Sequence, residues 1–373
     1  MTVYFPNWHI RSDDNAQVRL LPWDRLEGIN HAFWKVAPVA DGFALAPIDP
    51  WADVDPDNPL AHFPQYAECA KQHPAVRILL SVGGWSACGY FSAMALTAAG
   101  RGSFIRSCLE TLDAYPFLSG LDIDWEYPGV ARPPETGNEG NPVLGDDRTN
   151  YTLLLKELRE ALDEHFGTSA KILTVCAGAG LSTLNQQDYA ALHPFVDRVN
   201  LMTYDMAGPW DARTGHHTAL YGSTSADTAV RYLLGQGVPA EKIAIGSPLY
   251  SHGWRMNAPS PIHVGVPAKG LQGQDLRWRD LLPLEQAAVP EGVPGWHAGY
   301  DPKAAAAWLW NDDPASDEYL TFYTYENAAS LDAKLNYIRE RRLGGLIVWE
   351  VHGDSMEADW PMITEMHRWL AGA

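Results

Sequence analysis

Three acidic residues, Asp122, Asp124 and Glu126, follow one another at steps of two in the segment Gly-Leu-Asp-Ile-Asp-Trp-Glu-Tyr-Pro. Side chains alternate between the two faces of a β-strand, so the three carboxyl groups share one face. Ionised carboxylates about 7 Å apart repel one another, and we expect at least one to hold a proton near neutral pH. A protonated carboxyl group of this kind can act as a general acid.

This acidic row has two other interpretations. It could be a solvated acidic strand, although an exposed strand is unusual in a barrel. It could also be a divalent metal site, to which Asp205 is a candidate ligand from another strand. The neighbouring His216 and His217 also suggest a metal, but adjacent residues converge poorly on one ion, and we expect loop packing. We predict no metal and no cofactor.

Short apolar runs alternate with segments of helical periodicity along most of the chain. Strands are predicted over residues 3–5, 28–33, 77–82, 120–125, 172–177, 198–203, 242–247 and 345–349. Helices are predicted over residues 61–72, 102–114, 149–166, 185–192, 225–235 and 328–342. This order predicts an α/β fold, the (β/α)8 TIM barrel. A doubly wound open sheet normally has a glycine-rich phosphate turn after an early strand, and this sequence has none.

The seventh and eighth strands are separated by more residues than a strand-to-strand connection needs. Residues 254–320 are rich in Pro, Gly and Trp, and unstructured loops beyond about 15 residues are uncommon. We therefore predict a small α+β insertion domain over 254–320. The catalytic barrel would then comprise residues 1–253 and 321–373.

The composition excludes several classes of protein. The net charge is −19, which disfavours nucleic-acid binding because that binding requires an excess of Lys and Arg. No apolar run reaches the roughly 18 residues of a membrane span. The starting segment MTVYFPNWH lacks the pattern of a secretion signal, so we expect either a cytosolic chain or one already processed. The 15 tryptophans exceed what a core needs, and aromatic rings stack on sugar faces.

The segment from Ser119 to Glu126 resembles the signature D-x-x-D-x-D-x-E of the glycoside hydrolase family 18 chitinases. Other motifs of that family recur in the same order along nearly the whole chain. They are Tyr4-Phe-Pro-Asn-Trp8 on the first strand, Phe33 at the end of the second, Ser81-Val-Gly-Gly-Trp85 on the third, Met202-Thr-Tyr-Asp205 on the sixth, and Gly344-Gly-Leu-Ile-Val-Trp349 on the last. The predicted insertion resembles that of the deeper-cleft members.

The resemblance implies a chitinase that hydrolyses β-1,4-linked N-acetylglucosamine chains with retention of configuration, without a metal. The acetamido oxygen of the substrate would attack the anomeric carbon. Glu126 would donate a proton to the leaving oxygen and then activate water. Asp124 would bind the acetamido N–H and share a proton with Asp122. Tyr204 would bind the acetamido carbonyl, and Asp205 would bind a sugar hydroxyl and tune Glu126.

The same resemblance implies a set of residues that bind the sugar, with Trp349 as the floor beneath the distorted ring. The set comprises Tyr4, Phe33, Trp85, Met202, Trp349, Tyr250 and His252. Purely structural roles remain open as alternatives. Tyr4 and Trp349 could pack in the core, and Trp85 could pack on the surface. Ser81 could donate a hydrogen bond to Asp122 or could only need to be small.

Two positions depart from the pattern of the family. Ser119 stands where the signature has its first aspartate, and we expect retained activity with a shifted pH profile. His252 stands where the family often has an arginine, so its protonation could add pH sensitivity. The pairing of Cys69, Cys88, Cys108 and Cys176 is left open, although the absence of C-x-x-C spacing disfavours zinc.

Three other functions share parts of this pattern. An endo-β-N-acetylglucosaminidase acting on N-glycans would use the same carboxyl groups, whereas a chitin-binding chitinase-like lectin would lack the acid. A spore-cortex or peptidoglycan hydrolase would usually carry repeat modules, which this sequence lacks. The resemblance implies a secreted protein, with a cytoplasmic location as the alternative, and we expect a monomer. Endo or exo action cannot be inferred.

Overall fold

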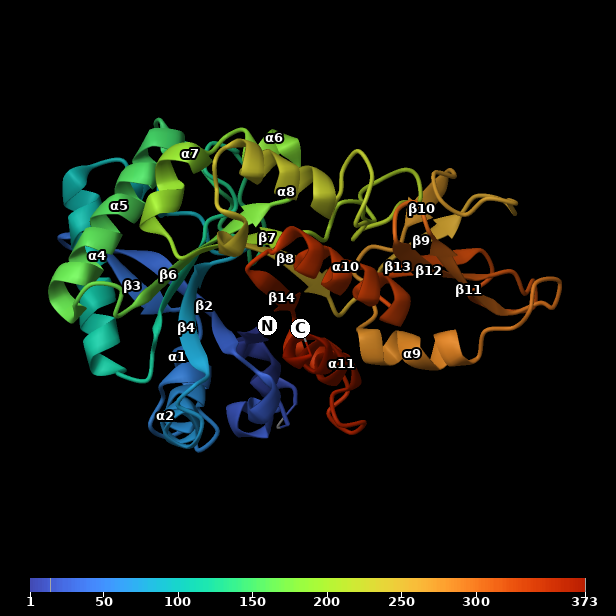
Figure 1. The fold of residues 1–373 in the computed structure, drawn as a ribbon, viewed down its shortest axis with the longest axis horizontal. Coiled ribbons are helices and arrows are strands. Elements are labelled where there is room, and N and C mark those ends of the chain that lie inside the picture. Colours follow the sequence, from blue (N-terminus) through green and yellow to red (C-terminus); the bar gives the residue numbers. More distant parts are fainter. Residues whose placement is uncertain (14, 373) are drawn as a thin grey trace.

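The computed structural model describes residues 1–13 and 15–372. Its centre is a closed barrel of eight parallel strands, in the order β1, β2, β4, β5, β6, β7, β8 and β14, with β14 paired to both β8 and β1 (Figure 1). The barrel strands are β1 Thr2–Pro6, β2 Gly28–Val39, β4 Arg77–Gly83, β5 Gly120–Asp124, β6 Ile172–Gly178, β7 Arg198–Met202, β8 Ile243–Pro248 and β14 Gly345–Trp349. The predicted (β/α)8 barrel is confirmed.

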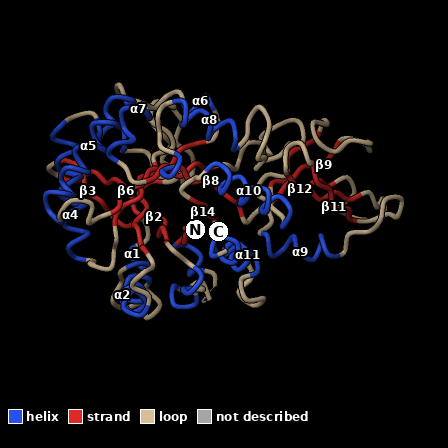
Figure 2. Tube along the Cα trace, viewed as in Figure 1, coloured by secondary structure: helices blue, strands red, loops and turns tan. Residues whose placement is uncertain are grey.

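Helices surround the barrel, as the blue segments of Figure 2 show. They are α1 Pro50–Asp53, α2 His62–Gln72, α3 Phe91–Ala95, α4 Ala98–Ala114, α5 Asp147–Phe166, α6 Leu181–Leu184, α7 Tyr189–Leu192, α8 Ala226–Gly235, α10 Ala328–Arg341 and α11 Pro361–Ala371. Short 3-10 helices lie at Asn7–Arg11, Val18–Leu20, Trp23–Arg25, His193–Phe195, Ala240–Lys242 and Val351–Gly353.

Two local features differ from the sequence-based prediction. The helix predicted over residues 185–192 begins only at Tyr189, because the Asp188 side chain caps it by accepting a hydrogen bond from the Ala191 backbone N–H. Strand β2 is longer than predicted and turns back through Gly42 into the antiparallel strand β3 Gly42–Pro47. The sequence analysis did not identify this hairpin.

Strand β5 carries the acidic row, and its alternation directs the carboxyl groups into the barrel. Leu121 and Ile123 belong to the large apolar core, whereas Asp122 and Asp124 face the opposite way. Asp122 is 0% exposed, and Asp124 is 3% exposed. The interpretation of this row as a solvated acidic strand is therefore wrong.

A second sheet lies between β8 and β14 in the sequence and beside the barrel in space, on the right of Figure 1. It is antiparallel, with the order β10-β9-β13-β12-β11. Its elements are β9 His252–Met256, β10 Ala268–Gly270, α9 Trp278–Gln286, β11 Trp296–Asp301, β12 Ala306–Asn311 and β13 Thr321–Tyr325.

This second sheet has an apolar core that includes Trp254, Met256 and Phe322. Strands β9 and β13 pair across His252 and Thr324, so the sheet extends slightly beyond residues 254–320 on both sides. The division into a barrel and an insertion domain stays a prediction. Among the described residues, no helix combines the length and apolar character that a membrane crossing requires.

Candidate active site

The carboxyl ends of the barrel strands surround a cavity of about 640 Å³. Nine of the twelve predicted site residues line it, namely Tyr4, Phe33, Trp85, Asp124, Glu126, Met202, Tyr204, Asp205 and Trp349. Asp122 is fully buried, and Tyr250 and His252 contact Asp205 without lining the cavity. The barrel therefore gathers most of the predicted site around one hollow.

Asp122 is surrounded by hydrogen-bond donors from four strands. Its two carboxylate oxygens accept from Tyr4 Oη (2.9 Å), Ser81 Oγ (2.8 Å), Thr174 Oγ1 (2.5 Å), Asn200 Nδ2 (2.9 Å) and Cys176 Sγ (3.5 Å). Donors of this number stabilise a carboxylate as an anion. Of the two interpretations of Ser81, the structure shows the hydrogen bond to Asp122.

Asp124 lies one step further along β5 in a different environment. Burial, followed by the negative charges of Glu126 and Asp122, raises the pKa of Asp124 well above its ordinary value. No hydrogen bond joins Asp124 to Asp122 among the described residues, and Asp124 Oδ1 is buried without a protein partner. The raised pKa favours the protonated form of Asp124, and its Oδ1 is an open acceptor at the cavity wall.

Glu126 completes the row just after the end of β5. Burial raises its pKa to about 7, and the charge of Asp205 adds to this, whereas Tyr127 and Arg132 act in the opposite direction. A carboxyl group with a pKa near 7 can give up a proton in one step and recover it in the next. This is the property that a general acid and base requires.

Tyr204 and Asp205 follow the end of β7. Burial raises the pKa of the Tyr204 phenol well above its ordinary value, so its hydroxyl group remains a donor. Gly246 on β8 leaves room for this ring, since a Cβ there would lie 2.6 Å from it. Asp205 Oδ1 accepts from Tyr250 Oη at 2.5 Å and lies 2.8 Å from His252 Nε2.

Aromatic rings form the apolar part of the cavity wall. Trp349 and Phe33 stack with their centroids 5.7 Å apart, and Trp8 lies 6.3 Å from both. Trp85 is 52% exposed, and the guanidinium of Arg132 lies 3.8 Å from its ring centroid. These surfaces can stack on the apolar faces of sugars, and about half of Trp85 stays exposed despite its contact with Arg132.

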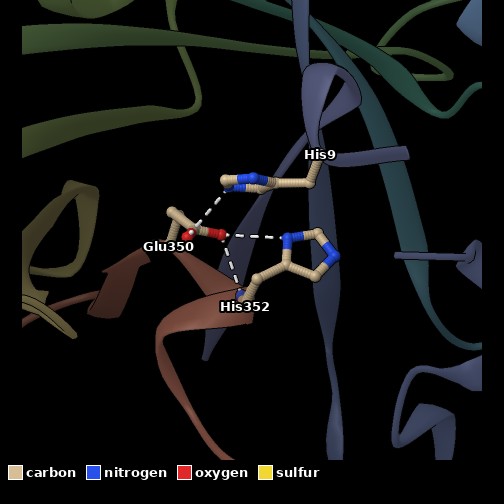
Figure 3. A group of neighbouring side chains, drawn as sticks. All are labelled: His9, Glu350 and His352. Carbon is tan, nitrogen blue, oxygen red and sulfur yellow. Dashed lines mark hydrogen bonds and ion pairs between the residues drawn. The ribbon is translucent and has the colours of Figure 1, made fainter. Parts of the chain in front are cut away.

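The residue after Trp349, Glu350, is held by two histidines. Figure 3 shows the Glu350 carboxylate between His9 and His352, at 3.3 Å from His9 Nε2 and 3.1 Å from His352 Nδ1. Burial opposes its charge, but hydrogen bonds to both histidines hold the pKa of Glu350 below its ordinary value. Arg277 contacts His9 Nδ1 at 3.4 Å, so we assign the proton of His9 to Nε2, which donates to Glu350.

Within residues 1–13 and 15–372, three clusters have ligand atoms spaced closely enough to hold a metal ion: His9 with Glu350 and His352, His31 with Asp53 and His62, and Asp205 with His217 and His252. Their carboxylates already accept hydrogen bonds from histidine. A metal ion would have to displace those protons, because it binds the lone pair of the nitrogen. The contacts in these clusters are therefore best described as hydrogen bonds between histidine and carboxylate.

Several site residues were missed from the sequence. Thr174 and Cys176 face inward from β6 at a spacing of two, and Asn200 faces inward from β7. The same alternation that identified the acidic row could have identified them. The cysteines, whose pairing the sequence left open, are free and buried.

The family model described as glycosyl hydrolases family 18 matches residues 1–354. Chitinase A of Pseudoalteromonas piscicida is 31% identical over 82% of this chain and 42% of its own length. The chain spans about half the length of such curated relatives.

Two solved structures match nearly the whole chain. One is a glycoside hydrolase family 18 N-acetylglucosaminidase from Paenibacillus barengoltzii, with 30% identity, a TM-score of 0.77 and coverage of 99% of this chain and 98% of the other. The other is the Ostrinia furnacalis Group IV chitinase in complex with allosamidin, with 26% identity, a TM-score of 0.83 and coverage of 100% and 98%. Because the family model spans nearly all of the described barrel, this chain belongs to family 18 of the glycosyl hydrolases.

Proposed function

We propose that this protein is a chitinase, which hydrolyses β-1,4-linked N-acetylglucosamine chains with retention of configuration and with Glu126 as the proton donor. The observation that carries the proposal is a glutamic acid whose pKa is raised to about 7 at the wall of an aromatic-lined cavity. Relatives that are named chitinases support the substrate class.

In the first step, the Glu126 carboxyl group gives its proton to the leaving oxygen while the acetamido carbonyl oxygen of the substrate attacks the anomeric carbon. Asp124 Oδ1, which has no protein partner, accepts the acetamido N–H. The Tyr204 hydroxyl group donates to the acetamido carbonyl oxygen. Both contacts orient the internal nucleophile and stabilise the charge that develops on the acetamido group.

In the second step, the Glu126 carboxylate takes a proton from water, whose oxygen attacks the anomeric carbon from the face that the leaving group vacated. The bond between the anomeric carbon and the acetamido oxygen breaks, which restores the acetamido group. Two successive inversions give net retention. The five donors around Asp122 stabilise its carboxylate, and this carboxylate in turn stabilises the positive charge on the intermediate. The ring of the reacting sugar rests on Trp349, and Trp85 extends the apolar surface.

The proposal takes the protein to act as a single chain on extracellular chitin, without nucleic acid, membrane or cofactor. The test is a short digestion of N-acetylchitohexaose, with product lengths and anomers resolved by chromatography. We expect the β-anomer to form first. Release of only the monosaccharide would indicate exo action, as in an N-acetylglucosaminidase.

Two other outcomes would contradict the proposal. Binding of the hexamer without cleavage would favour a chitin-binding lectin. Cleavage of an N-glycan core, but not of the hexamer, would favour an endo-β-N-acetylglucosaminidase.

A further inference from the structure

His252 lies behind Asp205 and touches a second carboxylate on its other side. Its Nε2 lies 2.8 Å from Asp205 Oδ1, and its Nδ1 lies 2.8 Å from Asp275 Oδ1. Asp275 belongs to the connection between β10 and α9, in the second sheet region. The side chain is 6% exposed, so few water molecules can replace either contact.

The two contacts determine the charge of His252. A carboxylate only accepts hydrogen bonds, so each ring nitrogen must carry a proton to bond its partner. A neutral imidazole has one N–H and could bond only one carboxylate. Burial disfavours the charged form, but the hydrogen bonds to Asp205 and Asp275 outweigh burial and raise the pKa of His252 to about 9.

Other groups around His252 do not compete for this charge. His217 lies 5.0 Å away between ring centroids, and burial, followed by the charge of His252, lowers its pKa well below the ordinary value. Tyr250 is neutral because burial and Asp205 raise its pKa. Trp210 packs edge-on at 5.2 Å and carries no charge. The positive charge on this side of Asp205 therefore comes from His252.

We infer that His252 is a positioning residue that acts as a cationic bridge, bracing Asp205 at the cavity against Asp275 of the second sheet. The inference deepens the proposed function, on which it rests. Asp205 needs such a brace because its backbone lies in the left-handed region (φ 56°) and its side chain is about half exposed. Tyr250 is the other group that holds the same oxygen.

The bridge also affects the proton donor. The negative charge of Asp205 contributes to the raised pKa of Glu126. The positive charge of His252 partly cancels that of Asp205, and loss of the cation should therefore raise the pKa of Glu126 further. Since both nitrogens of His252 are occupied by carboxylates, the residue acts on substrate through Asp205.

The first experiment measures the protonation of His252 by nitrogen-15 NMR of the imidazole, which does not depend on activity. We expect both nitrogens to be protonated at pH 7, with a midpoint near pH 9. In Asp275→Asn the midpoint should fall by about one pH unit or more, because one carboxylate is lost. A singly protonated His252 at pH 7, or an unchanged midpoint in Asp275→Asn, would overturn the inference.

The second experiment compares pH profiles of kcat/KM on a chitooligosaccharide. In His252→Gln we expect the alkaline limb of the profile to move to higher pH by about one unit, and the plateau value of kcat/KM to fall. His252→Arg should return the limb to its wild-type position. A reduced rate without a shifted limb would indicate a merely structural role and would contradict the inference. If the wild-type protein cleaves no chitooligosaccharide, the proposed function fails, while the NMR arm still decides the charge of His252.

His297→Gln is the matched control. His297 lies on β11 of the same sheet, with Nε2 at 2.9 Å from Asp312 and Nδ1 at 3.1 Å from the Val289 carbonyl oxygen, and it does not line the cavity. This variant should leave the alkaline limb in place. A limb shift equal to that of His252→Gln would attribute the effect to the stability of the sheet and would overturn the inference.

Discussion

Carboxyl side chains line the cavity on two sides, and their surroundings differ. On one side the surroundings favour the protonated carboxyl group, and on the other they favour the charged carboxylate. The row on β5 has Asp124 and Glu126, whose pKa values are raised chiefly by burial. On the other side, Asp205 shares the imidazolium of His252 with Asp275. The partners decide the difference, because like charges and burial favour the neutral acid whereas a cation favours the carboxylate.

This difference divides the chemistry between the two sides of the cavity. The β5 side can give and recover a proton, because Glu126 titrates near neutral pH. On the Asp205 side, the carboxylate is held in place by Tyr250 and His252. If that division is real, removing the acid should have the largest effect on catalysis and altering the edge of its strand the smallest.

Glu126→Gln should have the largest effect. The amide keeps the shape of the side chain but cannot give a proton to the leaving oxygen, so we expect kcat to fall about a thousandfold. Oligosaccharide affinity, measured by calorimetry, should change little. Glu110→Gln on the exposed side of α4 is the control, and a Glu126→Gln variant that keeps most of its rate would refute the assignment.

Asp124→Asn should come next. Asparagine can present an N–H group where the acetamido N–H needs an acceptor, so the acetamido group would be held less well in the transition state. We expect kcat/KM to fall about a hundredfold, comparable to the loss of one group that stabilises a charged transition state. A loss below tenfold would mean that Asp124 does not contact the acetamido group.

Asp122→Asn should reduce stability where Asp124→Asn does not. The asparagine would point an NH2 group at some of the five donors around Asp122, leaving a buried group without an acceptor. We expect the free energy of unfolding in urea to fall by about 2 kcal/mol. The raised pKa of Asp124 favours its neutral form, so replacement by neutral Asn should be tolerated. Equal losses for the two variants would contradict the difference between their environments.

The pH profile tests the proton donor without a mutation. Catalysis requires the protonated form of Glu126, whose pKa is raised to about 7, so kcat/KM should be constant below that pH and fall above it. The expected slope is about tenfold per pH unit for one ionisation. Initial rates on N-acetylchitohexaose between pH 5 and 9 would show it. A profile that stays flat to pH 9 would exclude Glu126 as the acid that limits the rate.

The barrel and the β5 row could be predicted because both are local patterns. Eight apolar runs mark the strands, and the spacing of two places Asp122 and Asp124 on one face whatever the rest of the chain does. The Asp275 contact depends instead on how the connection between β10 and α9 folds back against His252 on β9, which no local pattern predicts. Thr174 and Asn200 are harder to single out in the same way, because each is a single polar residue within an apolar strand and forms no repeated row.

Ser119→Asp should have the smallest effect. The sequence suggested that serine at this position shifts the pH profile, by withdrawing support from Asp122. In the structure, Ser119 lies before the start of β5, where its hydroxyl oxygen accepts from the Ile78 backbone N–H at 3.3 Å. The described hydrogen bonds to Asp122 come from other residues. An aspartate here should accept the same N–H and move the alkaline limb by no more than about 0.3 pH unit. A shift of one unit would instead show that charge at the start of the strand reaches Asp122, and that the acidic row is tuned along its whole length.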